Sequence, residues 1–138
     1  MSGRPRIYLV SACLVGLRTR YDALVKPCDG CRSYIGDAVW IPVCPEQLGG
    51  LPTPRPAADI VGGDGYDVLS GRARVVTGSG MDVTAQFLQG ARQVLAIAGG
   101  RRIDEILLKS KSPSCGMGLR FGVTAALLRQ HGFALKEF

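Results

Sequence analysis

The sequence predicts an α/β fold, organised as a three-layer sandwich with a mainly parallel, Rossmann-like sheet. Two observations support this prediction. Short apolar runs, typical of buried strands, alternate along the chain with segments that have the periodicity of helices. Strands that alternate with helices are joined by crossover connections, which make neighbouring strands parallel. At 138 residues the chain is long enough for one compact domain and too short for two ordinary ones, so we expect a single domain over residues 1–138.

The expected strands are short and apolar. They lie at residues 7–10, 39–43, 106–108 and 133–138, and Trp40, on the second of them, is expected in the core. Residues 68–76 are expected to form a small hairpin or two short edge strands, with the turn at Ser70 and Gly71. Residues 48–56 are rich in proline and glycine, so this segment is expected to be an irregular loop.

Two helices are predicted. The clearer one begins at Asp82 or Thr84, whose side chains are suited to an N-cap, and ends before Gly99 and Gly100. Its apolar residues recur at helical spacing and form one stripe: Phe87, Leu88, Ala91, Val94, Leu95 and Ala98. A second helix is expected at residues 124–130, and residues 21–37 form a mixed connection with room for a short helix.

The composition is that of an ordinary globular protein. Hydrophobic residues make up 46% and charged residues 20%, which excludes a disordered chain. The formal charge of +6 comes from scattered basic residues, so a solvated surface explains it better than a face that binds nucleic acid. The basic first residues precede only a short apolar run, and no later segment is long enough to span a bilayer. We therefore expect a cytoplasmic protein that does not bind membranes.

Five cysteines, an odd number, favour metal binding or catalysis over disulfides in a reducing compartment. Three of them, Cys13, Cys44 and Cys115, each follow an apolar run in a loop of small residues. In an α/β domain such loops gather at the carboxyl edge of the sheet, so the three thiols are expected to converge on one point. Three protein ligands leave a metal or cluster site with an open position, which catalysis requires.

Each candidate residue also has a purely structural interpretation. Cys13 and Cys44 are compatible with small buried hydrophobes. The segment Ser112-Pro113-Ser114 is compatible with a simple turn, which the residues alone favour. Arg55 is equally compatible with a surface residue and with a clamp for an anionic group.

Seven short motifs then occur in order over nearly the whole chain. They are Ser11-Ala12-Cys13-Leu14, Arg20-Tyr21-Asp22, Val43-Cys44-Pro45-Glu46, Gly49-Gly50-Leu51-Pro52-Thr53-Pro54-Arg55, Asp82-Val83-Thr84, Lys109-Ser110-Lys111-Ser112-Pro113-Ser114-Cys115-Gly116 and Gly122-Val123-Thr124-Ala125. In these motifs the chain resembles a bacterial family, long described as a domain of unknown function, that includes the thiouracil desulfidases.

The resemblance implies a cofactor and a reaction. The cofactor is a [4Fe-4S] cluster, held here by Cys13, Cys44 and Cys115 and sensitive to preparation in air. The fourth iron, free of protein thiolate, binds the sulfur of a thiolated nucleobase such as thiouracil. Hydrolysis then removes that sulfur and leaves the oxo base with no net redox change. A soft thiocarbonyl sulfur prefers a soft metal, so this chemistry agrees with the cysteine ligands.

The resemblance also assigns roles to two other residues, and two more are expected at the site. Glu46 and Ser112 are the expected catalytic acid/base groups, because they would activate water and relay a proton. Ser114 and Arg55 are the expected substrate-binding residues. The expected partner is a small thiolated base, without nucleic acid or membrane, and a homodimer is compatible with the sequence.

The chain departs from the family pattern in three places. Ala23 stands where a glycine usually follows Tyr-Asp, and the segment between Gly116 and Gly122 is short. Cys28-Asp29-Gly30-Cys31 is an additional CxxC pair. The pair leaves two alternatives open: a non-catalytic zinc or iron–sulfur module associated with RNA, and a dithiol oxidoreductase that uses Cys28 and Cys31.

Overall fold

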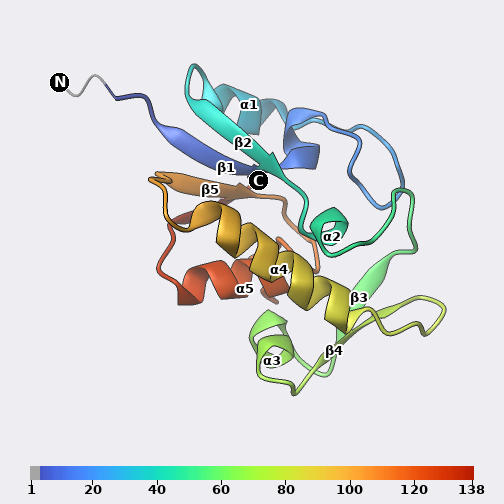
Figure 1. Cartoon of the computed structure of the whole chain (residues 1–138). Helices are drawn as coiled ribbons and strands as arrows, with labels where there is room; N and C mark the ends of the chain where they lie inside the picture. Colours follow the sequence, from blue (N-terminus) through green and yellow to red (C-terminus); the bar gives the residue numbers. More distant parts are fainter. Residues whose placement is uncertain (1–3) are drawn as a thin grey trace.

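The computed structural model describes residues 4–138 and contains a four-stranded parallel sheet (Figure 1). Residues 1–3, part of the basic N-terminal stretch, lie outside the described residues. The strand order is β2-β1-β5-β6, with β1 at Ile7–Ser11, β2 at Val39–Val43, β5 at Glu105–Leu108 and β6 at Leu135–Glu137. Each strand lies within one or two residues of its predicted position, and the predicted parallel sheet is confirmed.

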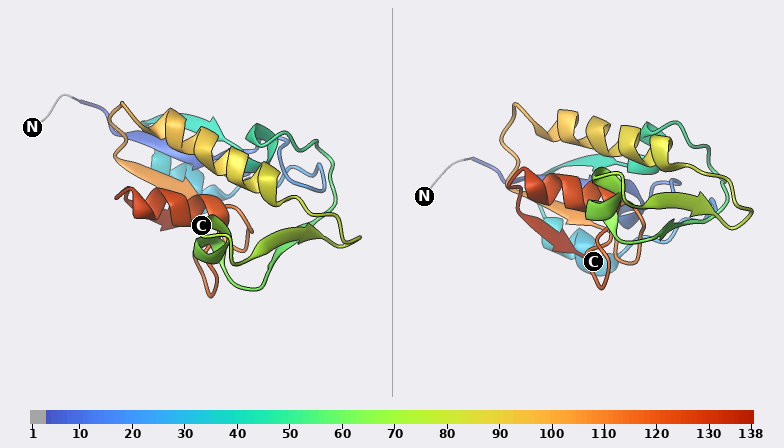
Figure 2. Two further views of the ribbon diagram at one scale, coloured as in Figure 1. Left: turned by 60° about the horizontal axis from the view of Figure 1, so that its bottom comes forward. Right: turned by 90° about the horizontal axis from the view of Figure 1, so that it is seen from below.

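Helices cover both faces of this sheet and form the outer layers of the predicted sandwich (Figure 2). One face carries α4 (Thr84–Ala98) and α5 (Val123–Gln130). The other carries α1 (Asp29–Ile35) and the 3-10 turn η1 (Ala12–Val15). Successive strand residues point to opposite faces, so Leu9 packs in the core under α4 and α5. Its neighbours Tyr8 and Val10 pack on the α1 side.

The strand β2 forms one edge of the sheet, and this position overturns one expectation. Trp40 is 44% exposed rather than buried, and Val39 beside it is 46% exposed. Only Val43, at the carboxyl end of β2, is buried. An edge strand also explains Pro42, because a residue that lacks an N–H donor is tolerated where one side of the strand has no partner.

A second, two-stranded sheet lies beyond one end of α4 and replaces the predicted hairpin at residues 68–76. Its antiparallel strands are β3 (Ala58–Val61) and β4 (Arg74–Thr77), and α3 (Gly65–Leu69) connects them. Val68 therefore lies in the last turn of a helix instead of starting a strand. The helix is fixed by a capping box, in which the Asp64 carboxylate accepts the N–H of Asp67 and the Asp67 carboxylate accepts the N–H of Asp64.

A short helix, α2 (Pro45–Leu48), packs directly on the backbone of α4. The contact depends on two glycines. A Cβ at Gly90 would lie 2.8 Å from the carbonyl carbon of Pro45 and closer still to its oxygen, and a Cβ at Gly49 would overlap the backbone of Gln86. Because neither glycine has a side chain, the two helices touch, and this contact holds the segment that contains Cys44 and Glu46. No helix within residues 4–138 is long and apolar enough to cross a membrane.

Candidate functional site

The three predicted ligand cysteines line one pocket at the carboxyl edge of the sheet. Cys13 lies in η1 after β1, Cys44 lies between β2 and α2, and Cys115 lies in the loop after β5. Because β1, β2 and β5 are parallel neighbours, their following loops meet at the same edge. The pocket has a volume of about 260 Å³, which suits a small ligand.

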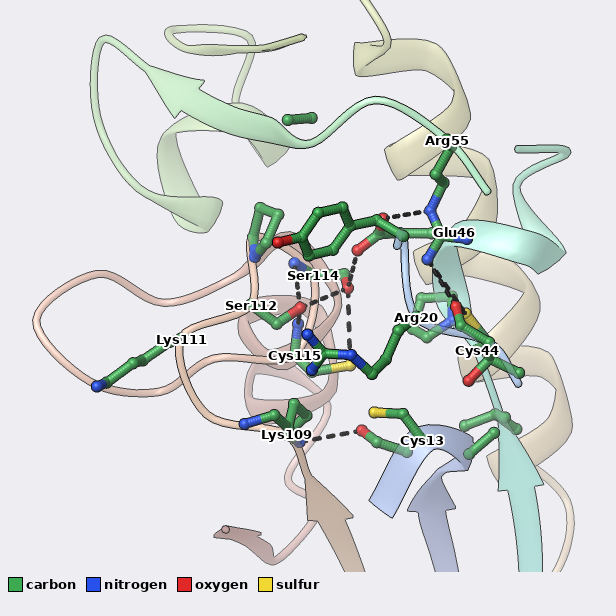
Figure 3. A pocket seen from close by; sticks show the side chains of 18 of the residues that line it. Cys13, Arg20, Cys44, Glu46, Arg55, Lys109, Lys111, Ser112, Ser114 and Cys115 are labelled. Carbon is green, nitrogen blue, oxygen red and sulfur yellow. Dashed lines mark hydrogen bonds and ion pairs between the residues drawn. The ribbon is translucent and has the colours of Figure 1, made fainter. Parts of the chain in front are cut away.

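The three thiols are free and influence one another. Cys115 is buried, and burial raises the pKa of its thiol to about 12, although hydrogen bonds from Ser11 and Ser114 act in the opposite direction. Burial also raises the pKa of Cys13, and the nearby Cys44 raises it further. These mutual effects place the thiols within electrostatic reach of one another, around the space shown in Figure 3.

Basic side chains around the pocket favour the thiolate forms. Arg20 and Lys109 both lower the pKa of Cys13, and Arg55 lowers that of Cys44, although burial outweighs them in each case. A thiolate is the form that binds metal, so these cations would compensate the negative charge of a bound, thiolate-ligated group. Figure 3 shows the Arg20 side chain lying across the pocket.

The thiols face one pocket but do not converge on a single ion. Among residues 4–138, no three Cys, His, Asp or Glu side chains are close enough together to hold one metal ion. The three thiols share one pocket, as expected, and their ligation of one common group stays a prediction. In an iron–sulfur cluster each thiolate binds a different iron, so the ligands surround the group instead of meeting at one atom.

A chain of hydrogen bonds crosses the pocket beside the thiols (Figure 3). Glu46 forms an ion pair through Oε1 with Arg55 Nε at 2.9 Å. Its Oε2 accepts a hydrogen bond from Ser114 Oγ at 3.1 Å. Ser112 Oγ lies 3.0 Å from Ser114 Oγ, so with Ser114 donating to Glu46, Ser112 donates to Ser114. The structure thus connects all four non-cysteine residues predicted for the site.

Arg55 is buried, with 9% of its surface exposed, so it is not a surface residue. Its guanidinium donates to Glu46, to the Pro52 carbonyl, to Thr53 Oγ1 and to the Thr19 carbonyl. These bonds direct its charge at Glu46 and at the loops on either side of the pocket. An arginine held in this way orients a carboxylate through a rigid planar fork.

Ser112 combines the two interpretations given to its segment. Its Oγ accepts the backbone N–H groups of Ser114, at 3.2 Å, and Cys115, at 3.1 Å, as a turn residue does. The same turn presents Cys115 to the pocket and leaves the Ser112 hydroxyl proton for Ser114. Ser114 is almost fully buried, at 2% exposed, and its hydroxyl also lies 3.7 Å from the sulfur of Cys115.

Some residues of the pocket have no role in the sequence-based assignment. Arg20 pairs with Asp22 at 2.8 Å, and this bond lowers the pKa of Asp22 to about 2. The motif Arg20-Tyr21-Asp22, one of the seven motifs, was the sequence signal that could have placed Arg20 at the site. Ala23 directly after it adopts a φ of 60°, the conformation that the usual glycine would accept without strain.

The short segment after Gly116 borders a second, wider cavity of about 890 Å³ next to the pocket. The pocket and this cavity have a common wall, which includes Ser110, Lys111, Ser112 and Pro113. Leu119 is fully exposed at the rim. The pocket therefore adjoins a broad opening on the side where the chain is shorter than the family pattern.

Comparisons with known proteins agree with this geometry. The model of the 2-thiouracil desulfurase family matches residues 8–137. The chain belongs to this family. It is similar in structure to a [4Fe-4S]-dependent thiouracil desulfidase, TudS, with a TM-score of 0.80 and 37% sequence identity over 97% of this chain and 91% of TudS. It is also 42% identical, over 137 residues and 91% of each chain, to the uncharacterized protein YbbK of Bacillus subtilis (strain 168).

Family membership agrees with the sequence-based resemblance and with an enzymatic activity. The TudS structure shares the α/β fold described above, which confirms the predicted fold class. The CxxC pair lies outside the pocket of this chain, because neither Cys28 nor Cys31 lines it.

Proposed function

We propose that the protein is an iron–sulfur-dependent desulfidase that hydrolyses the C–S bond of a thiolated nucleobase such as thiouracil. The observation that carries the proposal is the placement of three free thiols and a tethered carboxylate around one small pocket. The described cofactor of TudS and the family of this chain support the same reaction.

The donor set suits a [4Fe-4S] cluster with three protein ligands. Three separate loops supply soft sulfur donors: Cys13, Cys44 and Cys115. Nearby cations favour the thiolate charge of the first two. The three thiols surround a common space without meeting at one ion, as cluster ligands do. Bound there, the cluster would supply a soft Lewis acid for the thiocarbonyl sulfur, which polarises the C–S bond.

Glu46 is the proposed base for the attacking water. Its two carboxylate oxygens are held by Arg55 and Ser114, and each oxygen retains a lone pair for a further hydrogen bond. A water molecule beside Glu46 would lose a proton to the carboxylate as it attacks the ring carbon. The C–S bond would then break, the sulfur would leave as hydrogen sulfide with the two protons of the water, and the oxo base would form with no change in oxidation state.

Ser114 and Ser112 continue this proton path. The hydroxyl of Ser114 lies between the carboxylate and Ser112, so a proton taken up by Glu46 can pass along the chain through exchange of hydrogen bonds. Ser112 therefore exchanges protons with Glu46 only through Ser114. Arg55 acts as a positioning residue, because its donors engage Glu46 and the loop carbonyls. Direct contact of Ser114 or Arg55 with substrate stays a prediction.

The test begins with anaerobic reconstitution by iron and sulfide, followed by metal analysis and the absorption of the iron–sulfur chromophore. We expect Cys13→Ala, Cys44→Ala and Cys115→Ala each to abolish a full cluster. Cys28→Ser is the matched control and keeps it. A full cluster in all three pocket variants would exclude the proposed ligands.

A second measurement separates catalysis from cofactor binding. Glu46→Gln is expected to keep the iron content of the parent protein and to slow sulfide release from thiouracil by about 10²-fold or more, since general-base catalysis contributes about 10²–10⁴-fold. Glu105→Gln, a change on a strand away from the pocket, is the control. Equal rates for Glu46→Gln and the parent protein would remove Glu46 from the mechanism.

We further propose that residues 1–138 act as one domain in the cytoplasm and that its partner is a small thiolated base, without nucleic acid or membrane. A single cooperative unfolding transition is the expected sign of one domain. Sedimentation equilibrium distinguishes a monomer from a homodimer.

A further inference from the structure

The CxxC pair stands apart from the pocket and is unused by the proposed reaction. Cys28 is the N-cap residue of α1, and Cys31 is the third residue of that helix. The N-cap residue precedes the first turn and lies three positions before Cys31, and the Cys28 side chain makes no capping hydrogen bond. Residues three apart in a helix have Cα atoms within the range that a disulfide bridges.

The position of the Cys28 sulfur supports this arrangement. A Cβ built on Gly30 would lie 3.9 Å from Cys28 Sγ, so the sulfur lies over the first turn of α1 and not away from it. Cys28 and Cys31 also pack against the same hydrophobic cluster, which includes Leu14 and Ile35. Both sulfurs therefore occupy one small region between α1 and η1.

The two thiols differ in access. Cys31 is fully buried, whereas Cys28 is partly exposed and has exposed residues on both sides, at 24–27 and 29–30. An external reagent can reach the Cys28 sulfur first. The Cys31 sulfur is reached from Cys28, inside the first turn. This division into an attacking and a resolving cysteine is the arrangement that thiol–disulfide exchange uses.

We propose that Cys28 and Cys31 form a reversible dithiol–disulfide site, separate from the catalytic pocket, that exchanges with low-molecular-weight disulfides such as oxidised glutathione. The Cys28 thiolate attacks one sulfur of the external disulfide, forms a mixed disulfide and releases one thiol. Cys31 then attacks the Cys28 sulfur and releases the second thiol. The pair loses two electrons and two protons, and the external disulfide gains both to become two thiols.

The site lies next to a proposed cluster ligand. The N–H of Cys28 donates to the carbonyl of Leu14 at 2.9 Å, and Leu14 directly follows Cys13 in η1. Cys13 also lies close enough to affect the titration of Cys31. Oxidation of the pair would therefore act on the segment that presents Cys13, although the exchange reaction itself depends on neither cluster nor substrate.

The experiment uses the reduced full chain, treated with oxidised glutathione under anaerobic conditions, alkylated and mapped by mass spectrometry without reduction. We expect a disulfide between Cys28 and Cys31, seen as a peptide in which neither cysteine is alkylated and which reduction converts to the dithiol form. Cys31→Ser should accumulate glutathione on Cys28, because the resolving thiol is missing. Cys28→Ser should slow oxidation of Cys31 at least tenfold, and Ser33→Ala, on the same helix, should behave as the parent protein.

Three results would overturn the proposal. They are recovery of Cys28 and Cys31 as alkylated thiols while other cysteines oxidise, absence of trapped glutathione in a folded Cys31→Ser protein, and equal oxidation of Cys31 in Cys28→Ser. If Cys31→Ser does not fold, as judged by circular dichroism, the peptide map of the parent chain decides alone. Because this assay measures covalent mass, its outcome is independent of desulfidase activity.

Discussion

Replacement of Gly90 by alanine tests whether the contact between α2 and α4 positions the catalytic segment. The new Cβ would lie 2.8 Å from the carbonyl carbon of Pro45, where an ordinary contact is at least 3.4 Å. The two backbones must therefore move apart by at least about 0.6 Å, and further at the carbonyl oxygen. Since Pro45 lies between Cys44 and Glu46, this movement displaces both residues relative to the pocket.

Two opposing terms set the size of the effect on stability. Overpacking of a close contact costs about 1–3 kcal/mol, whereas alanine in place of glycine within a helix gains about 1 kcal/mol. Because the clashing atoms of Pro45 belong to the backbone, the upper end of the first range applies. We expect a net loss of about 2 kcal/mol, and thus a fall in Tm of roughly 6 °C for a domain of this size. Displacement of Glu46 by a fraction of an ångström should also slow catalysis on the order of tenfold.

Thermal unfolding followed by circular dichroism, and sulfide release from thiouracil, measure the two effects. Gly78→Ala is the matched control, because an added Cβ there meets no atom within 4 Å. An unchanged or raised Tm together with an unchanged rate for Gly90→Ala would refute the idea that direct backbone packing places Glu46.

Three further predictions concern the loops of the pocket. Arg55→Lys keeps the charge but loses the planar fork that binds Glu46, so kcat should fall about 10-fold or more at unchanged iron content; an unchanged kcat would contradict the positioning role. Ala23→Gly should raise the Tm, since a φ of 60° costs alanine about 1–2 kcal/mol, and a lower Tm would show that the strain is absent. The carboxyl of Asp22, bonded to Arg20, should titrate near its pKa of about 2 in an NMR experiment, and Arg20→Gln should raise that pKa. Because the folded pKa lies below the ordinary value, the bond stabilises the fold above about pH 4 and is lost as the pH falls toward 2; titration near 4 in the parent protein would contradict this.

The central sheet is predictable from the sequence because its strands are short apolar runs followed by loops. The position of a strand within the sheet is not. Trp40 and Val39 have the character of core residues, yet β2 lies at an edge and leaves them half exposed. Edge and centre are decided by the order in which strands pair, a long-range property that an isolated apolar run does not encode. Pro42 is the one local sign, since proline is rare in central strands.

The predicted hairpin at residues 68–76 failed for a related reason. Val75 and Val76 do form a strand, but their partner is the earlier segment Ala58–Val61. A capping box at Asp64 and Asp67 starts a helix between the two strands. This box has aspartate where glutamate or glutamine is usual, so the local signal was present in an uncommon form.

The candidate site likewise has one part that the sequence predicts and one part that it does not. Cysteines that follow parallel strands are brought to one edge by topology, so Cys13, Cys44 and Cys115 share a pocket as the sequence indicates. The engagement of Arg55 is different, because it depends on the exact path of the loop that returns its guanidinium to Glu46. Such a path arises from many weak contacts and has no signature at the level of residue spacing.

The exposed Trp40 gives the molecule a built-in optical reporter. It is the only tryptophan in the chain, so all indole fluorescence originates at one edge of the sheet. Cys44 follows four residues later, about 13 Å away along an extended strand. A chromophore bound at Cys44 that absorbs where indole emits would quench this fluorescence through energy transfer, which falls steeply with distance. Assembly of a coloured group in the pocket can thus be followed in real time without a label.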